Sequence, residues 1–209
     1  MKKIGLLIVF GLILTPKTEA GKLAGKLLLK HDTMDVTFNI PVNFVTQKIN
    51  YEKLQYRIKY VDSTGKKVVI RPEQAEEIRF NYEEEEVRML SRYCSPGLNH
   101  EFSRKRKVFL KLEIDGILKM FKYYFTENSP AVYNGSENIT TGGYSIPATR
   151  YVLQKSGEEI FIPGELTFRK NMVEYFQDCP ALSLKIENKE YRKKDLEIII
   201  SYYNANCAK

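Results

Sequence analysis

The chain of 209 residues contains no tryptophan, two histidines and three cysteines. The histidines, His31 and His100, lie in different regions, so they do not form the closely spaced sets that bind zinc. No HExxH, CxxC, GxSxG, Walker A or GxGxxG pattern occurs. We expect no metal and no cofactor, and the sequence favours a non-enzymatic protein over an enzyme.

Long hydrophobic runs are also missing, except at the N-terminus. There, Lys2 and Lys3 precede eleven apolar or glycine residues, 4–14. A helix that spans a bilayer needs about 20 apolar residues, so this run is too short. Small residues up to Ala20 then match a signal peptidase site. We expect a signal peptide over residues 1–20, cleaved near Ala20, rather than a short anchor helix.

Such a signal predicts an exported, soluble mature protein with no transmembrane span, located in the periplasm, in the cell envelope or outside the cell. The whole chain carries a net charge of +7, and the first twenty residues hold three lysines and one glutamate, so cleavage leaves +5. The densest basic runs are 104–107 and 192–194. They are either solvated surface or a contact for anions. The expected partner is an envelope protein, an anionic glycan or a lipid headgroup, and nucleic acid is disfavoured.

Residues 21–163 mostly alternate between apolar and polar side chains, which is typical of antiparallel strands. Residues 54–61 and 66–71 flank a turn sequence and predict a hairpin. The pair Asp115–Gly116, between two alternating segments, favours a type I′ hairpin. This region predicts an antiparallel sheet of hairpins arranged as a meander.

One long segment, 126–144, is polar and rich in turn residues, and it predicts a long mobile loop. Its part 128–144, together with basic and aromatic neighbours, is the candidate binding surface. The candidate binding residues are Lys122, Tyr123, Tyr124, Tyr133 and Tyr144. The alternative is that these tyrosines only pad the sheet, as aromatic side chains often do.

After Gly164 the hydrophobic period becomes helical. It predicts three helices, the first from Phe168 and closed by Asp178, the second at about 180–187 and the third at about 193–204. Residues 164–209 are expected to form a three-helix cap on the sheet. The predicted fold class is α+β, with both parts in a single compact domain.

Cysteine placement is the most specific chemistry in the chain. Cys179 lies between the first two predicted helices and Cys207 just after the third. An exported protein meets an oxidising compartment, so we expect a Cys179–Cys207 disulfide, although pairings with Cys94 remain open. Closing this loop contributes roughly 3–4 kcal/mol. An unpaired Cys94 would be a buried thiol or an intermolecular partner.

A carboxylate-based hydrolase of envelope glycans or peptides is the alternative function, because glycosidases need only two carboxylates. The candidates are Asp32, Asp35, Asp62 and Asp115, and three of them lie in predicted turns. A catalytic cysteine would need a nearby histidine, which the sequence does not place. The sequence therefore assigns no catalytic residue.

The C-terminal stretch FRKNMVEYFQDCPALSLKIENKEYRKKDLEIIISYYNANC joins an EYxxDCP turn to a closing YNxxC motif. It resembles the ending of a group of exported bacterial proteins of uncharacterised activity. VDSTGKKVVIRPEQAEEIRFNY and VFLKLEIDGILKMFKYY are also similar to theirs. The resemblance covers most of the mature chain and implies export and architecture, with no catalytic residue. We expect a non-enzymatic binding or envelope-associated module.

Overall fold

The computed structural model describes residues 21–44, 46–62, 64–95, 98, 104–129, 131–134 and 139–207, with only the backbone at 131–134 and 139–141. The predicted signal segment and His100 lie outside these residues.

The described residues contain eleven strands and five short helices, joined by turns and loops. The strands are β1 (Lys22–Leu28), β2 (Thr33–Asn39), β3 (Ile58–Val61), β4 (Lys67–Ile70), β5 (Glu77–Tyr82), β6 (Glu85–Cys94), β7 (Arg106–Ile114), β8 (Leu118–Asn128), β9 (Ala131–Asn134), β10 (Ile139–Gly142) and β11 (Ser145–Lys155). The helices are α1 (Tyr51–Leu54), α2 (Phe168–Tyr175), α3 (Pro180–Glu187), the 3-10 helix η2 (Lys193–Asp195) and α4 (Leu196–Asn206).

Nine strands form one antiparallel sheet in the order β11-β8-β7-β6-β5-β1-β2-β3-β4. Strands β1 to β4 form one meander, and β5 to β8 with β11 form another. The antiparallel pair β1–β5 joins them. At this junction a Cβ on Gly25 would lie 2.1 Å from the carbonyl oxygen of Arg79, so the close strand approach requires glycine. The predicted antiparallel sheet followed by C-terminal helices is confirmed.

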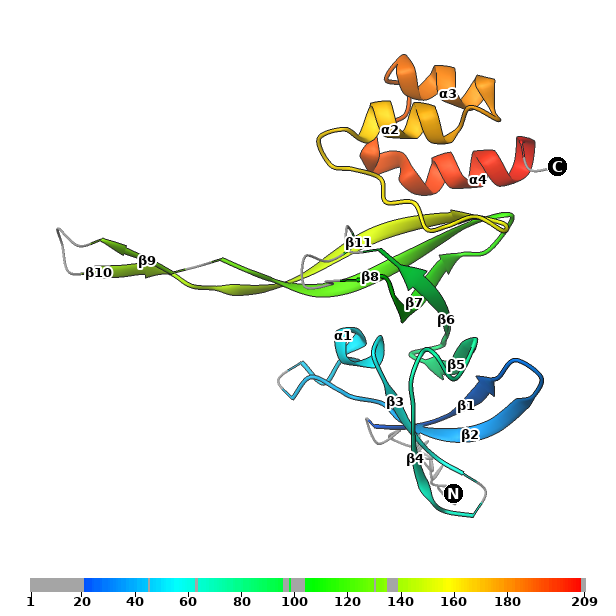
Figure 1. Cartoon of the computed structure of the whole chain (residues 1–209), viewed down its shortest axis with the longest axis vertical. Coiled ribbons are helices and arrows are strands. Elements are labelled where there is room, and N and C mark those ends of the chain that lie inside the picture. The colour runs from blue at the N-terminus through cyan, green and yellow to red at the C-terminus, as the bar shows by residue number, and fades with distance from the viewer. Residues whose placement is uncertain are drawn as a thin grey trace, which may run out of the picture.

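The segment predicted as a loop is largely a β-ribbon. Strands β8 and β11 pair from Leu118 and Lys155 out to Asn128 and Ser145, and β9 and β10 then pair beyond them. In Figure 1 this hairpin projects as a long arm away from the rest of the molecule. The loop prediction was wrong because the polar and turn residues of this segment hide the strand preference of the β-branched residues in β9 and β10.

Two local predictions on the strands also need correction. Leu54 ends α1, which Asn50 caps by accepting a hydrogen bond from the Lys53 amide at 3.0 Å, so the predicted strand begins only at Ile58. The β7–β8 connection is not a type I′ turn. That turn needs positive φ at both central residues, and Asp115 does not have it.

Three hydrophobic clusters fill the interior. The first lies among β1 to β6, and the second lies between β6, β7, β8 and β11. In the third, the apolar residues of α2, α3 and α4 pack with Leu118, Met120 and Leu153 of β8 and β11. Figure 1 shows these helices on one side of the β8–β11 hairpin and α1 on the other.

Two side-chain amides continue the β8 ladder where β7 does not pair with it. At one end Asn204 of α4 accepts from the Leu118 amide and donates to its carbonyl, both at 2.9 Å. At the other end the buried Gln55 accepts from the Tyr124 amide at 2.7 Å and donates to its carbonyl at 2.8 Å. Each amide satisfies a donor and an acceptor of an open strand edge. Strand β8 thus joins the C-terminal helices to the first half of the chain.

Within the described residues, no helix has the length and apolar character needed to cross a membrane.

Candidate functional site

Strand alternation separates three of the predicted binding residues. Lys122 and Tyr124 point to one face of β8, and Tyr123 points to the other. Tyr123 is fully buried, so its side chain offers no surface to a ligand. Its assignment as a binding residue is therefore wrong.

Lys122 and Tyr124 both contact other side chains of the protein. The Lys122 Nζ is 3.4 Å from Glu113 Oε1 and 5.2 Å from the centre of the Tyr151 ring. Tyr124 stacks on Tyr51 of α1 with ring centres 4.7 Å apart. Burial raises the pKa of the Tyr124 hydroxyl above its usual range. The Tyr124–Tyr51 stack fastens α1 to the sheet, and the Lys122 contacts link neighbouring strands, so both residues have a structural use.

The other two predicted residues belong to the arm. Tyr144 has 56% of its surface exposed and lies just before β11. The side chain of Tyr133, in β9, lies outside what the structure describes. The five predicted residues therefore do not converge on one site among the described positions.

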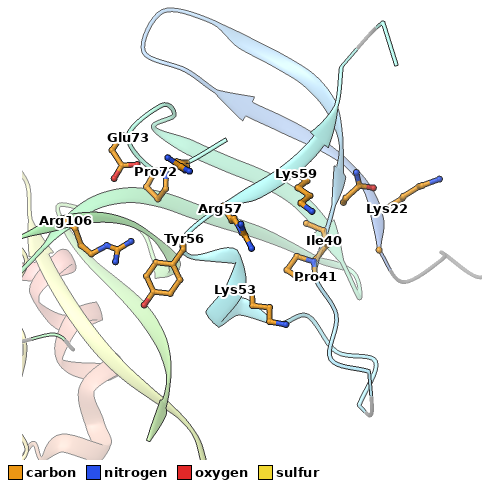
Figure 2. Close-up of a pocket in the computed structure, with 13 residues that line it drawn as sticks. Lys22, Ile40, Pro41, Lys53, Tyr56, Arg57, Lys59, Pro72, Glu73 and Arg106 are labelled. Atoms are coloured by element: carbon orange, nitrogen blue, oxygen red, sulfur yellow. The ribbon is translucent and has the colours of Figure 1, made fainter. Parts of the chain in front are cut away.

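A basic cleft in the first half of the chain is the stronger candidate. It has a volume of about 1120 Å³, and six of its thirteen lining residues are lysine or arginine. The six cations are Lys22, Lys53, Arg57, Lys59, Arg71 and Arg106, and the one acidic lining residue is Glu73. Figure 2 shows that the labelled side chains come from separate elements: Lys22 from β1, Lys53 from α1, Arg57 and Lys59 from the start of β3, Glu73 from the β4–β5 connection and Arg106 from β7.

Strand register brings two of the lysines into one row. Lys22 of β1 and Lys59 of β3 both pair with Asn39 of β2, one from each side. Residues directly opposite one another point to the same face, and two strand spacings separate the lysines by about 10 Å. A row of this kind spreads positive charge along one wall of the cleft.

The β3–β4 hairpin places two of the arginines next to each other. Arg57 precedes Lys59 by two residues, so both point outward while Ile58 is buried. Because Ile58 pairs with Ile70, the next residues, Arg57 and Arg71, come side by side at the hairpin's open end. The hairpin therefore presents three cations on one exposed face.

Five of these cations have no acidic partner within the described part of the chain. The side chains of Lys22, Lys53, Arg57, Lys59 and Arg71 form no ion pair with any residue that the structure describes. Like charges in a concave site repel one another and raise the local positive potential. The cleft is consequently suited to an anion that supplies the missing charge.

An aromatic residue forms part of the cleft wall. The Arg106 guanidinium lies over the Tyr56 ring, 4.9 Å from its centre. Behind it, the Tyr56 hydroxyl and the buried Tyr123 hydroxyl are hydrogen-bonded at 2.9 Å. Through this hydrogen bond the buried Tyr123 positions Tyr56 from within the core.

The basic run 104–107 is divided by the start of β7. Arg106 lines the cleft, whereas Lys105 and Lys107 face the Tyr93 ring, at 5.9 and 5.2 Å from its centre. Lys105 also pairs with Glu159. Only one residue of the predicted polyanion-binding run joins the cleft.

Sequence reasoning missed the other five cleft cations because each stands alone or in a pair along the chain. A signal was present at Arg57 and Lys59, since their alternation with the apolar Ile58 and Tyr60 places them on the outer face. Their convergence with Lys22 and Arg71 depends on strand pairing, which local patterns do not contain.

Two of the candidate carboxylates share a separate, shallower hollow of about 510 Å³. Asp35 and Asp62 line it together with Glu86. Asp62 accepts hydrogen bonds from the Thr64 hydroxyl, 2.7 Å, and the Lys66 amide, 3.0 Å, and these bonds lower its pKa. A catalytic acid needs a raised pKa, so Asp62 is instead an ionised turn residue.

Cys94 is buried and unpaired, and burial raises its pKa to about 12. A thiol that stays protonated at neutral pH is a poor nucleophile and metal ligand. Among the described residues, no three histidine, cysteine or acidic side chains lie together as a metal site.

Comparison of the chain with family models, with curated proteins and with solved structures gave no match. The functional assignment rests on geometry, and the resemblance to exported bacterial proteins stays a prediction.

Proposed function

We propose that the protein is an exported, non-enzymatic binding module whose basic cleft holds an anionic glycan. The observation that carries this proposal is the convergence in one cleft of five cations that form no ion pair with any described residue. A ligand with several carboxylate or phosphate groups would neutralise them and relieve their mutual repulsion.

The spread of the cations favours an extended ligand over a single small anion. The row from Lys22 to Lys59 spans about 10 Å, and Arg71 and Arg106 add charge from two further elements. The site is also concave. A glycan chain can enter a cleft, whereas a flat membrane surface meets a protruding basic patch more readily.

Three further predictions frame the proposal. The signal at residues 1–20 would export the protein to a compartment that contains envelope glycans. Cys179 and Cys207 lie at disulfide distance, with 5.6 Å between their Cα atoms, and we propose that they are bonded there. The C-terminal helices would then act as a cap on the sheet rather than as a second binding unit.

The test is binding of a labelled short oligogalacturonate, which has one carboxylate per sugar, measured by fluorescence anisotropy. The double variant Arg57→Glu/Lys59→Glu should weaken binding about tenfold or more, because two attractive contacts become repulsive. Binding by the unaltered protein should weaken as salt rises, since ions screen the cleft.

A matched control is Lys30→Glu/Lys194→Glu, which changes the net charge equally at two exposed positions outside the cleft. It should leave affinity within about twofold, because distant surface charges are screened. Equal losses in both variants would show diffuse charge attraction and contradict the proposal. So would equally tight binding of a neutral oligosaccharide.

The carboxylate-based hydrolase remains a second candidate because Asp35 and Asp62 share one hollow. Incubation of neutral and acidic oligosaccharides with the protein, followed by mass spectrometry, tests it. Shortened products that disappear in Asp35→Asn would support the hydrolase.

A further inference from the structure

The start of the described chain lies at the basic cleft. Gly21 lines the cleft together with Lys22, and its carbonyl oxygen accepts a hydrogen bond from the Ile40 amide at 2.6 Å. Ile40 itself lines the cleft. Gly21 is therefore held beside the cations by backbone pairing, independently of any side chain.

We infer that signal cleavage after Ala20 adds a binding group to the cleft, namely the α-ammonium of Gly21. In the uncleaved chain this nitrogen is a neutral peptide amide. After cleavage it is a positive charge at the cleft, near the row of Lys22 and Lys59. The inference rests on the proposed function, and it makes export processing the step that completes the anion site.

The new charge would differ from its neighbours in its response to pH. An α-amino group ordinarily titrates near pH 8, whereas lysine, arginine and glutamate side chains ordinarily titrate outside the range from pH 6 to 9. The described groups that face it are Lys22 on β1, Lys53 on α1, Tyr56 and Arg57 just before β3, Lys59 on β3, Arg71 and Glu73 after β4, and Arg106 on β7. Among the residues that the structure describes, no histidine lines the cleft. A change in ligand affinity across this range would thus report on the α-amino group.

The experiment compares three forms of the chain in binding labelled oligogalacturonate at pH 6 and pH 9. The first begins at Gly21 and is released from a fusion by a protease that cleaves before glycine. The second has the same chain with its α-amino group acetylated and its lysines intact. The third carries a Gly-Ser-Gly-Ser extension, which keeps the charge but allows it to move up to about 14 Å away.

At pH 6 the first form should bind about threefold more tightly than the other two, the effect of one charge roughly 6 Å from a ligand anion in water. At pH 9 this advantage should disappear. Equal binding by all three forms at both pH values would overturn this inference and leave the proposed function standing. Absence of binding by every form would overturn both.

Discussion

Two groups of cations in this molecule have opposite surroundings. In the basic cleft, Arg57 and Lys59 are exposed and have no acidic partner among the described residues. Under the C-terminal helices, Lys155 is nearly buried and donates to the Tyr175 carbonyl at 2.7 Å and to Asp178 at 2.8 Å. The rings of Tyr175, Phe176 and Tyr203 also surround its ammonium group, at 4.6 to 5.7 Å.

The difference separates a cation that stabilises the fold from cations that are available to bind a ligand. The ammonium of Lys155 donates to two acceptors within the chain and is nearly buried, so it contributes to stability and is poorly placed to meet a ligand. The cleft cations add little to stability and retain that capacity. The polar residues of the C-terminal EYxxDCP and YNxxC stretch also stabilise the fold, as Lys155 does. Asp178 accepts from both Lys155 and the Tyr203 hydroxyl, and Asn204 completes the β8 ladder.

The largest effect is expected from removing the proposed Cys179–Cys207 disulfide with the double variant Cys179→Ser/Cys207→Ser. The loss of a closed loop between residues 28 apart should lower the free energy of unfolding by roughly 3–4 kcal/mol, measured by urea denaturation. Oligogalacturonate affinity should remain unchanged below the transition, because the described lining residues of the cleft lie between Gly21 and Arg106, well before both cysteines. The reduced unaltered protein is the control and should match the variant. Free thiols at both positions in the unreduced protein would refute the proposed disulfide.

A smaller loss is expected from Lys155→Met, which keeps the apolar stem and removes the ammonium group. Two charge-assisted hydrogen bonds disappear, and the half-exposed Asp178 can partly turn to water, so the cost should be about 1–3 kcal/mol. Differential scanning calorimetry at neutral pH measures it. No change in the melting temperature would mean that the enclosed lysine does not stabilise the helices.

The Lys155 effect should depend on pH in one direction. Burial alone would raise the pKa of Asp178, but hydrogen bonds from Lys155 and Tyr203 outweigh it and lower the pKa. A lowered pKa means that the stabilisation is present above about pH 4 and is lost as the pH falls further. The gap between the variant and the unaltered protein should therefore narrow in acid, and a constant gap would contradict this account.

The smallest effect, with the opposite sign, is expected from neutralising the cleft with Arg57→Gln/Lys59→Gln. These two cations have no acidic partner among the described residues, so their removal relieves repulsion. The free energy of unfolding at low salt should rise by up to about 0.5 kcal/mol, and added salt should erase the gain. A clear loss of stability would mean that these cations hold the fold, and the contrast with Lys155 would fail.

Much of the secondary structure could be predicted because its signals are local. Residues 180–187 were predicted as a helix from Pro180 at its first position and the apolar spacing that follows, and α3 has these bounds. The third predicted helix became η2 and α4, since its first turn takes the tighter 3-10 form. The arm was missed because a long two-stranded ribbon resembles a loop in composition.

The candidate site could be predicted only in fragments. Arg106 was named within the basic run, and Tyr123 was named for the wrong reason, as a surface residue rather than as the buried support of Tyr56. The row of Lys22 and Lys59 exists because β2 pairs with both β1 and β3. No single segment of sequence contains that information.

The sequence by itself determined the alternating strands, the position of the C-terminal helices and the two cysteines that meet there, because each depends on the period and type of neighbouring residues. Only the tertiary structure decided which cations are enclosed and which are left for a ligand. Strand register and helix α1 bring five dispersed basic residues into one cleft, where they have no acidic partner among the described residues. The packing of the C-terminal helices on β11 places Lys155 among three aromatic rings. Charge pairing acts between residues close in space, so a linear pattern records the charges but not their partners.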